Sequence, residues 1–482
     1  MSQLNGNPIT PQVVTGAEVD LAIDKLALGG KALGRVGGCV VFVEHALPGQ
    51  RLRVRITRKK ANFAEAQVVQ LLAQSPAYAP PFCRHFGVCG GCHWQDLAYG
   101  EQLHWKREQV QESLRHLGGL TPEQVLPTAA SPHTRYYRNK MEFTFGPGPG
   151  GCSLGLHLQG SRDRIFDLQE CFLQSPQTGA FVKKVRSLCR QSGLPAYNPK
   201  TRRGFWRFLV LRESKSTAQM LAHLITTDQG DPAAVAALAA ALTSTFPAIT
   251  TLVHSLSRTR AQVASGADSR TLLGPGYIEE ELGGLRLRIS AHSFLQTNTA
   301  AAAGLYDAVR RFGGFRGSET VWDLYCGAGS IALYLARQVR RVVGFELVPE
   351  AVNDAYINSR LNGVDNCSFL AGDLKERLKE ALGTGSLPRP EVIITDPPRS
   401  GMHPQVVQAL QELAPGRIIY VSCNPATLAR DLALLGNHYE IAAVQPFDLF
   451  PHTAHIECVA RLERRRSYPA SFTNFSKCQT PY

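Results

Sequence analysis

The sequence predicts a chain of three parts: an N-terminal β-barrel, an α+β central domain and a C-terminal doubly wound α/β domain. The prediction depends on short strand patterns before residue 75, a cysteine-rich middle segment, and a regular alternation of strand and helix patterns from residue 320 onward. A chain of 482 residues is long enough for several domains, each with its own core. The net charge of +13 favours a polyanionic partner, nucleic acid above all.

We assign residues 14–74 to the barrel and expect residues 1–13 to be disordered. The expected strands are Glu18–Ile23, Gly29–Arg35, Cys39–Val43, Arg51–Lys59 and Ala64–Leu71. Short strands separated by glycine and proline turns are typical of a small barrel with five strands. One strand and the turn after it are strongly basic, with Arg51, Arg53, Arg55, Arg58, Lys59 and Lys60. Alternate residues of a strand share one face, so this basic stripe is a candidate phosphate-binding surface, the alternative being an ordinary solvated face.

Residues 75–290 form the predicted central domain, which contains four candidate metal ligands. Three of them lie in a tight loop and the fourth lies further along the chain: Cys83, Cys89, Cys92 and Cys171. Four thiolates can hold zinc or an iron–sulfur cluster, and their spacing does not choose between the two. The domain is also expected to contain the helices Glu101–Leu117 and Pro232–Thr243, the strands Lys140–Phe145, Phe205–Arg212 and Gln219–Thr226, and a hairpin loop at Gly146–Gly151.

Residues 291–463 contain the alternating pattern of a parallel sheet covered by helices on both faces. The expected strands are Val321–Tyr325, Arg341–Glu346, Cys367–Leu370, Val392–Thr395, Arg417–Ser422 and two more near Tyr439–Val444 and His455–Arg461. The expected helices are Ser330–Gln338, Pro349–Leu361, Pro404–Leu413 and Pro425–Leu435. The basic tail, residues 464–482, lacks periodicity and is expected to be disordered.

A glycine loop after the first of these strands predicts a nucleotide-type cofactor site. Gly327 and Gly329 fit the loose dinucleotide pattern, which would also suit a nicotinamide-dependent oxidoreductase. Three acidic residues at the ends of the first three strands, Asp323, Glu346 and Asp373, favour a cationic ligand instead. S-adenosylmethionine carries a sulfonium and an ammonium group, which carboxylates attract.

Further strand ends supply a candidate nucleophile and two carboxylates. We expect Asp396 and Cys423 to end the strands that flank the first strand, and Glu457 to lie on a late strand. A thiolate that adds to C6 of a pyrimidine turns C5 into a carbon nucleophile able to accept a methyl group, and a base must then remove the C5 proton. We expect Arg399 and the start of the next helix to lower the pKa of the Cys423 thiol.

The chain resembles the RNA 5-methyluridine methyltransferases, in particular the bacterial 23S ribosomal RNA uracil-C5 branch, over residues 14–462. The segments that carry the resemblance are Phe294-Leu-Gln296-Thr-Asn298, Asp323-Leu-Tyr-Cys-Gly-Ala-Gly329, Asp396-Pro-Pro-Arg399, Ser422-Cys-Asn-Pro425 and His455-Ile-Glu457. It implies a class I, Rossmann-like methyltransferase domain, an OB-like TRAM barrel that binds RNA, and a 4Fe-4S cluster on the four cysteines.

The resemblance also implies roles for single residues. Gln296, Tyr325, Glu346 and Asp373 would contact the methyl donor, and Asp396 would lie between donor and target base. Cys423 would be the nucleophile and Glu457 the base that takes the proton. By the same likeness, a helix within residues 97–120 would pack on the catalytic domain.

These expectations describe a cytoplasmic, monomeric enzyme with no membrane segment. Its substrate would be ribosomal RNA, with transfer RNA as the alternative that the same domain set permits. A rival from another class is a non-catalytic RNA-binding protein that uses only the barrel and the cluster.

Overall fold

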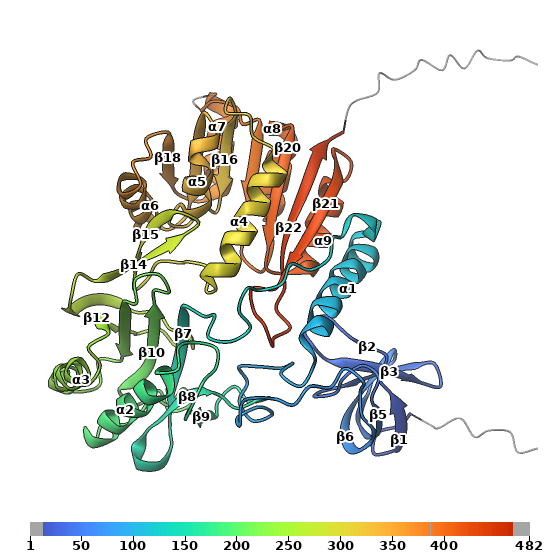
Figure 1. Cartoon of the computed structure of the whole chain (residues 1–482), viewed down its shortest axis with the longest axis vertical. Helices are drawn as coiled ribbons and strands as arrows, with labels where there is room; N and C mark the ends of the chain where they lie inside the picture. Colours follow the sequence, from blue (N-terminus) through green and yellow to red (C-terminus); the bar gives the residue numbers. More distant parts are fainter. Residues whose placement is uncertain (1–12, 386, 466–482) are drawn as a thin grey trace, which may run out of the picture.

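The computed structural model describes residues 13–385 and 387–465, arranged as three packed units (Figure 1). The predicted disordered N-terminus, Val13 apart, and the basic tail beyond Arg465 lie outside the described residues. In Figure 1 the C-terminal unit is at the top, the central unit at lower left and the barrel at lower right. No helix among the described residues combines the length and apolarity that crossing a membrane requires.

The N-terminal unit is a six-stranded sheet that curls around its own core. Its strands are β1 (Glu18–Ala22), β2 (Lys25–Leu26), β3 (Ala32–Val36), β4 (Cys39–Val43), β5 (Arg51–Lys59) and β6 (Phe63–Ala73), in the order β1-β5-β6-β4-β3-β2. The five expected strands are present, and the two-residue β2 is an addition. The expected strand from Gly29 begins only at Ala32, because Gly29 and Gly30 adopt left-handed backbone angles and form a turn.

The central unit is a seven-stranded sheet in the order β13-β12-β11-β10-β7-β8-β9. Its strands are β7 (Lys140–Gly146), β8 (Ser153–His157), β9 (Ile165–Asp167), β10 (Trp206–Glu213), β11 (Met220–Thr226), β12 (Ile249–Leu256) and β13 (Ala267–Leu273). The helices α2 (Thr178–Gln191) and α3 (Pro232–Thr245) pack with it in one hydrophobic cluster. The expected hairpin loop joins β7 to β8. The sequence analysis missed α2, whose N-cap residue, Gln177, makes no side-chain capping bond.

The C-terminal unit is a seven-stranded sheet in the order β18-β17-β16-β19-β20-β22-β21. Its strands are β16 (Thr320–Leu324), β17 (Arg341–Glu346), β18 (Cys367–Ala371), β19 (Val392–Thr395), β20 (Arg417–Ser422), β21 (Tyr439–Phe447) and β22 (Glu457–Arg464). The first five strands of this order are parallel, and β22 and β21 are antiparallel to their neighbours. The helices are α4 (Thr299–Gly313), α5 (Ser330–Leu335), α6 (Pro349–Leu361), α7 (Leu374–Thr384), α8 (Pro404–Leu413) and α9 (Pro425–Leu435).

Two details of this sheet differ from expectation. Helix α7, which Asp373 caps with its side chain, was not expected between the third and fourth strands. Asp396 follows β19, the direct neighbour of β16, but Cys423 follows β20, one strand further out. The expectation that both residues end strands flanking the first strand was therefore wrong for Cys423.

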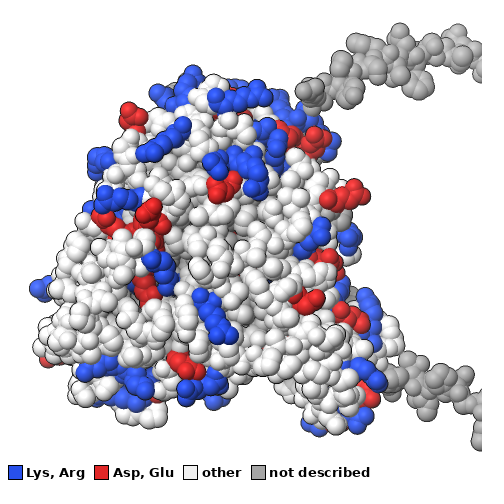
Figure 2. All heavy atoms as spheres, viewed as in Figure 1, with Lys and Arg blue, Asp and Glu red and all other residues white. Residues whose placement is uncertain are grey.

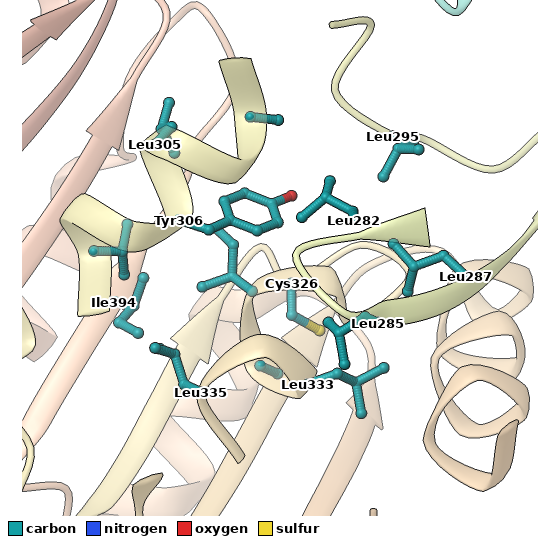
Figure 3. Packing of buried hydrophobic residues seen from close by; sticks show 14 of the residues in the cluster. Leu282, Leu285, Leu287, Leu295, Leu305, Tyr306, Cys326, Leu333, Leu335 and Ile394 are labelled. Carbon is teal, nitrogen blue, oxygen red and sulfur yellow. The ribbon is translucent and has the colours of Figure 1, made fainter. Parts of the chain in front are cut away.

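The hairpin of β14 (Tyr277–Leu282) and β15 (Leu285–Ser290) packs with the C-terminal unit, although the sequence analysis places it before residue 291. Figure 3 shows its leucines, Leu282, Leu285 and Leu287, beside Tyr306 of α4 and Leu333 of α5. This cluster buries the apolar face of the hairpin, and it also includes Leu221 and Val253 of the central sheet.

Helix α1 (Tyr99–Gly118) joins the barrel to the C-terminal unit, as Figure 1 shows. Its apolar residues Val110 and Leu114 share a buried cluster with Leu428 and Leu432 of α9. At its end, an added Cβ on Gly118 would lie 3.0 Å from the carbonyl oxygen of Ala429, so the glycine permits this close approach.

The same helix carries a fully buried ion pair to the segment between β21 and β22. Lys106 Nζ lies 2.5 Å from Asp448 Oδ1, and both side chains are inaccessible to solvent. The ammonium group also donates to the carbonyl of Phe450 at 3.2 Å. One turn earlier, Gln102 donates to Nδ1 of His452 and accepts from its backbone N–H. We call residues 448–456 the docking loop, because α1 fixes it at these points.

Replacing Lys106 with methionine should destabilise the protein by about 3–5 kcal/mol, because it leaves the Asp448 carboxylate buried without its cation. The midpoint of urea denaturation measures the effect. The matched control is Arg310→Met, which removes an exposed pair with Asp307 and should cost less than about 1 kcal/mol. Equal midpoints for the two variants would contradict the structural role of the buried pair.

Candidate active site and cysteine cluster

A cleft of about 900 Å³ opens at the carboxyl ends of the parallel strands in the C-terminal unit. It collects most of the residues that the sequence analysis singled out for the cofactor and the chemistry. Those that line it are Gln296, Tyr325, Gly327, Glu346, Asp373, Asp396, Cys423 and Glu457. Asp323 and Gly329 do not line the cleft.

The glycine loop is shaped by close packing and by one carboxylate. The Gly327 N–H donates to Oε2 of Glu346 at 3.0 Å, and the other oxygen of Glu346 accepts from the Val348 N–H at 2.9 Å. An added Cβ on Gly329 would lie 2.9 Å from the Phe369 ring, so this glycine lets α5 pack against the sheet. Tyr325, which begins the loop, holds a left-handed backbone with φ of 64°, which is uncommon for a residue with a side chain.

Asp323 lies inside β16, beneath the cleft, and is 1% exposed. Neither of its carboxylate oxygens has a hydrogen-bond partner among the described residues. Burial, with a smaller effect of Asp396, raises the pKa of Asp323 to about 8. This carboxyl is therefore largely neutral at pH 7. That weakens the argument that the charge of Asp323 attracts a cationic ligand.

Asp373 differs from Asp323 in its exposure to solvent and in the direction of its pKa shift. It is exposed at the start of α7, where its Oδ1 accepts from the Lys375 N–H at 3.0 Å. That bond, together with the Lys375 ammonium, lowers the pKa of Asp373. It is ionised at neutral pH and lies on the wall of the cleft.

Cys423 is half-buried at the end of β20, and its surroundings favour the neutral thiol. Burial first, then Glu457 and Asp396, raise the pKa of Cys423 to about 11. Arg399 lowers it, as expected, but by less than burial raises it. The expected lowering of the thiol pKa was therefore wrong.

The two carboxyl groups near this thiol are also shifted toward their neutral forms. Glu457 is 4% exposed, and burial followed by the influence of Asp396 raises its pKa well above the ordinary value. Loss of water at the base of the cleft raises the pKa of Asp396 to about 7. The cleft thus holds one thiol and two carboxyl groups whose charges depend on what binds there.

The cleft also has apolar walls that the sequence analysis did not assign. Phe294 and Leu347 line it and are 64% and 65% exposed, unusually high values for large apolar side chains. Val348 and Phe450 line it as well. Leu347 and Val348 directly follow Glu346, so their place at a strand end could have revealed them, whereas Phe450 is brought in by the docking loop.

The four cysteines predicted to bind metal converge on one small cavity in the central unit, as its lining shows: Cys83, Cys89, Cys92 and Cys171. Burial raises the pKa of every one of these thiols, to about 12 for Cys92. An added Cβ on Gly91 would lie 3.0 Å from Leu156 and 3.6 Å from the sulfur of Cys89, so glycine leaves room for the loop to wrap. No group of three or more His, Cys, Asp or Glu within the described ranges could hold a single metal ion.

The basic stripe of the barrel is partly neutralised. Arg53 and Arg55 lie on the outer face of β5, as expected, and pair with Asp20 and Glu18 of β1 at 2.9 and 2.7 Å. Figure 2 accordingly shows basic and acidic residues side by side on the barrel at lower right. Arg51, Arg58, Lys59 and Lys60 complete the stripe, and Arg58 is 4.0 Å from Glu65.

Comparisons with known proteins agree with this architecture. The TRAM domain family matches residues 12–69, and the tRNA (uracil-5-)-methyltransferase family matches residues 260–465. An RNA methyltransferase of Nitratidesulfovibrio vulgaris is 43% identical over 453 residues, 93% of this chain and 97% of the relative. One of Bacteroides thetaiotaomicron is 39% identical over 91% of this chain and its own full length.

A solved structure shows the same fold. It is that of the Pyrococcus abyssi tRNA (uracil-54, C5)-methyltransferase in complex with S-adenosyl-L-homocysteine, which is 28% identical with a TM-score of 0.72. The match covers 92% of this chain and all of the other. The predicted methyltransferase fold and TRAM barrel are thereby confirmed. The comparisons do not support the two alternatives, a nicotinamide-dependent oxidoreductase and a non-catalytic RNA-binding protein. The chain belongs to the RNA 5-methyluridine methyltransferase family, enzymes that depend on S-adenosylmethionine.

Proposed function

We propose that the protein methylates C5 of a uridine in RNA through a covalent bond between Cys423 and C6 of the base. The observation that carries this proposal is the meeting of Cys423, Glu457 and Asp396 in one cleft with the candidate donor-binding residues. C5 of a stacked base is out of reach, so the uridine must be flipped into this cleft. The exposed Phe294 and the Phe450 ring offer apolar surface to a flipped base.

In the proposed reaction the Cys423 thiolate adds to C6, and C5 gains the electron density of an enolate. The bound donor supplies an electrophilic methyl group on a sulfonium. A bond forms between C5 and the methyl carbon while the bond from sulfur to that carbon breaks, which leaves S-adenosylhomocysteine. Glu457 then takes the proton from C5, the C5=C6 double bond re-forms, and the bond from C6 to Cys423 breaks.

The electrostatics of the cleft suit these roles. The buried setting that raises the pKa of Glu457 makes its carboxylate a stronger base than an exposed glutamate. The high pKa of Cys423 means that the thiol must lose its proton once RNA and donor are bound, and Arg399 stabilises the thiolate. Asp396 lies in the same cleft, where it can contact both the donor and the base. Gln296, Tyr325, Glu346 and Asp373 would hold the donor.

We propose ribosomal RNA as the substrate, on the resemblance of the sequence to the 23S branch. Transfer RNA is the second candidate, because the similar solved structure is that of an enzyme named for uracil-54 of tRNA. The outer face of β5, with Arg51 and Lys59, and the following Lys60 are the proposed contact for the phosphate backbone in either case.

We also propose that Cys83, Cys89, Cys92 and Cys171 hold a 4Fe-4S cluster. A cluster attaches each thiolate to a different iron, and four thiols around one cavity supply that number of ligands, although the described residues contain no group of three or more that could hold a metal ion. The apolar lining, with Leu156, Leu168 and Leu173, would keep water from the cluster. The group would then serve as a structural link within the central unit.

Substitution of Cys423 by alanine should lower methyl transfer by at least on the order of 10³-fold, since it removes the proposed nucleophile. The assay uses labelled S-adenosylmethionine and total RNA from cells that lack the protein, followed by mapping of 5-methyluridine in ribosomal and transfer RNA. Cys39→Ala, on the barrel, is the control and should retain activity. Full transfer by the Cys423 variant would refute the covalent route, and product in tRNA alone would reverse the choice of substrate.

Replacing Glu457 with glutamine should slow release of the product by about 10²–10⁴-fold, because the C5 proton loses its base. We expect a covalent protein–RNA complex that survives a denaturing gel and contains the transferred methyl group. Combining Glu457→Gln with Cys423→Ala should abolish this complex. Normal turnover by Glu457→Gln, with no adduct, would assign the proton abstraction to another group.

Protein purified without oxygen should contain about four iron atoms per chain and absorb broadly in the visible range. Cys92→Ser should lose most of the iron, because one buried ligand is missing, while Cys39→Ser should keep it. Stoichiometric zinc in place of iron would contradict the proposed cluster.

A further inference from the structure

A second depression of about 360 Å³ lies beside Cys423, outside the cleft described above. All three units contribute to it. Its lining residues are Leu28, Gly29, His93, Arg399, Cys423, Asn424, Pro425, Ala454, His455 and Ile456. We call it the flanking pocket.

The flanking pocket adjoins the catalytic cleft, because Arg399 and Cys423 line both. On its other side it shares Gly29 and His93 with a smaller hollow, which lies between the barrel and residues 83–94, here called the cysteine loop. The three hollows therefore follow one another from the donor cleft, past the proposed nucleophile, to the barrel. An RNA chain that places one nucleotide over Cys423 must place the next nucleotide near the rim of the cleft.

The walls of the flanking pocket are held in place by contacts between the units. The His93 N–H donates to the carbonyl of His452 in the docking loop at 2.8 Å. On the barrel side, a Cβ on Gly30 would lie 2.9 Å from the Cβ of Ala454, which shows how closely the two loops approach. The neighbouring Gly29 has open space around its backbone and a φ of 90°. Contacts between the units therefore determine the shape of the flanking pocket.

The side chains that line the pocket suit an unstacked nucleotide. None of them is acidic, although Glu44 and Asp96 line the hollow beyond. The Leu28 side chain is 42% exposed, and the His93 side chain is exposed as well. His455 lies 3.5 Å from the Arg399 guanidinium, between Nδ1 and an arginine nitrogen. Imidazole rings stack on bases, and a guanidinium binds phosphate.

We propose that the flanking pocket binds the nucleotide next to the target uridine, with its base against Leu28 and His93 and its phosphate at Arg399. This inference rests on the proposed function, because it requires a uridine over Cys423. By this inference, Leu28 of the barrel and His93 of the cysteine loop help to select the uridine that is methylated. The barrel then contributes more than general affinity for RNA.

The experiment uses the full, cluster-containing protein and short RNAs that contain the mapped uridine. One set carries an abasic nucleotide on the 5′ or 3′ side of that uridine. We expect the abasic nucleotide on one side to lower kcat/KM about tenfold for the wild type, chiefly through KM, because a stacked base is lost. His93→Ala and Leu28→Ala should each cause a similar loss on intact RNA but little further loss on that abasic RNA.

The controls are His116→Ala and Leu117→Ala, which change exposed residues of the same types at the far end of α1. Binding of S-adenosylhomocysteine should be the same in all variants, which separates the pocket from the donor site. If the wild type methylates the uridine while His93→Ala and Leu28→Ala match the controls, or if their losses add fully to the abasic loss, the flanking pocket does not bind that nucleotide. Absence of methylation by the wild type would overturn the proposed function and this inference together.

Discussion

The arrangement of the catalytic cleft depends on the fixation of the docking loop. This loop leads from β21 into β22, where Glu457 is the first residue. Its conformation includes a left-handed backbone at His452, which the surrounding contacts must enforce. Lys106 and Gln102 provide two of these contacts, and Tyr137 adds a third by donating to the carbonyl of Pro451 at 3.1 Å. The proposed role of Glu457 requires accurate positioning of its carboxyl group, and residues from outside the methyltransferase unit hold the loop that leads to it.

Four ionisable groups at or beneath the cleft share a shift of the pKa toward the neutral form, and burial is the main cause. Burial raises the pKa values of Asp323, Asp396, Glu457 and Cys423, and the neighbouring Asp396 carboxyl adds to the effect on the other three. A cationic donor placed among these groups would favour their ionised forms by Coulomb attraction. Donor binding and formation of the thiolate are therefore expected to support each other, since each supplies the charge that the other lacks.

Much of the fold could be predicted from the sequence, because strand and helix periods are local properties. The glycine loop and the strand ends at Glu346, Asp396 and Cys423 also follow from local pattern. Sheet order and pKa values do not, since they depend on residues distant in sequence. The effect of burial on Cys423 outweighs that of Arg399, and only the packed structure reveals this. The partners of Arg53 and Arg55 were equally hidden, because Asp20 and Glu18 face them only once β1 pairs with β5.

Backbone hydrogen bonds connect the cysteine loop to the docking loop, and they suggest a structural role for the proposed cluster. His93 and Trp94, directly after Cys92, both donate backbone N–H groups to the carbonyl of His452, at 2.8 and 3.1 Å. The Trp94 carbonyl in turn accepts from Gln102 of α1 at 2.9 Å. A group that rigidifies the loop at Cys92 would rigidify the docking loop by the same bonds, and with it the entry to Glu457. Loss of that group would then loosen the active site without removing any residue that touches the substrate.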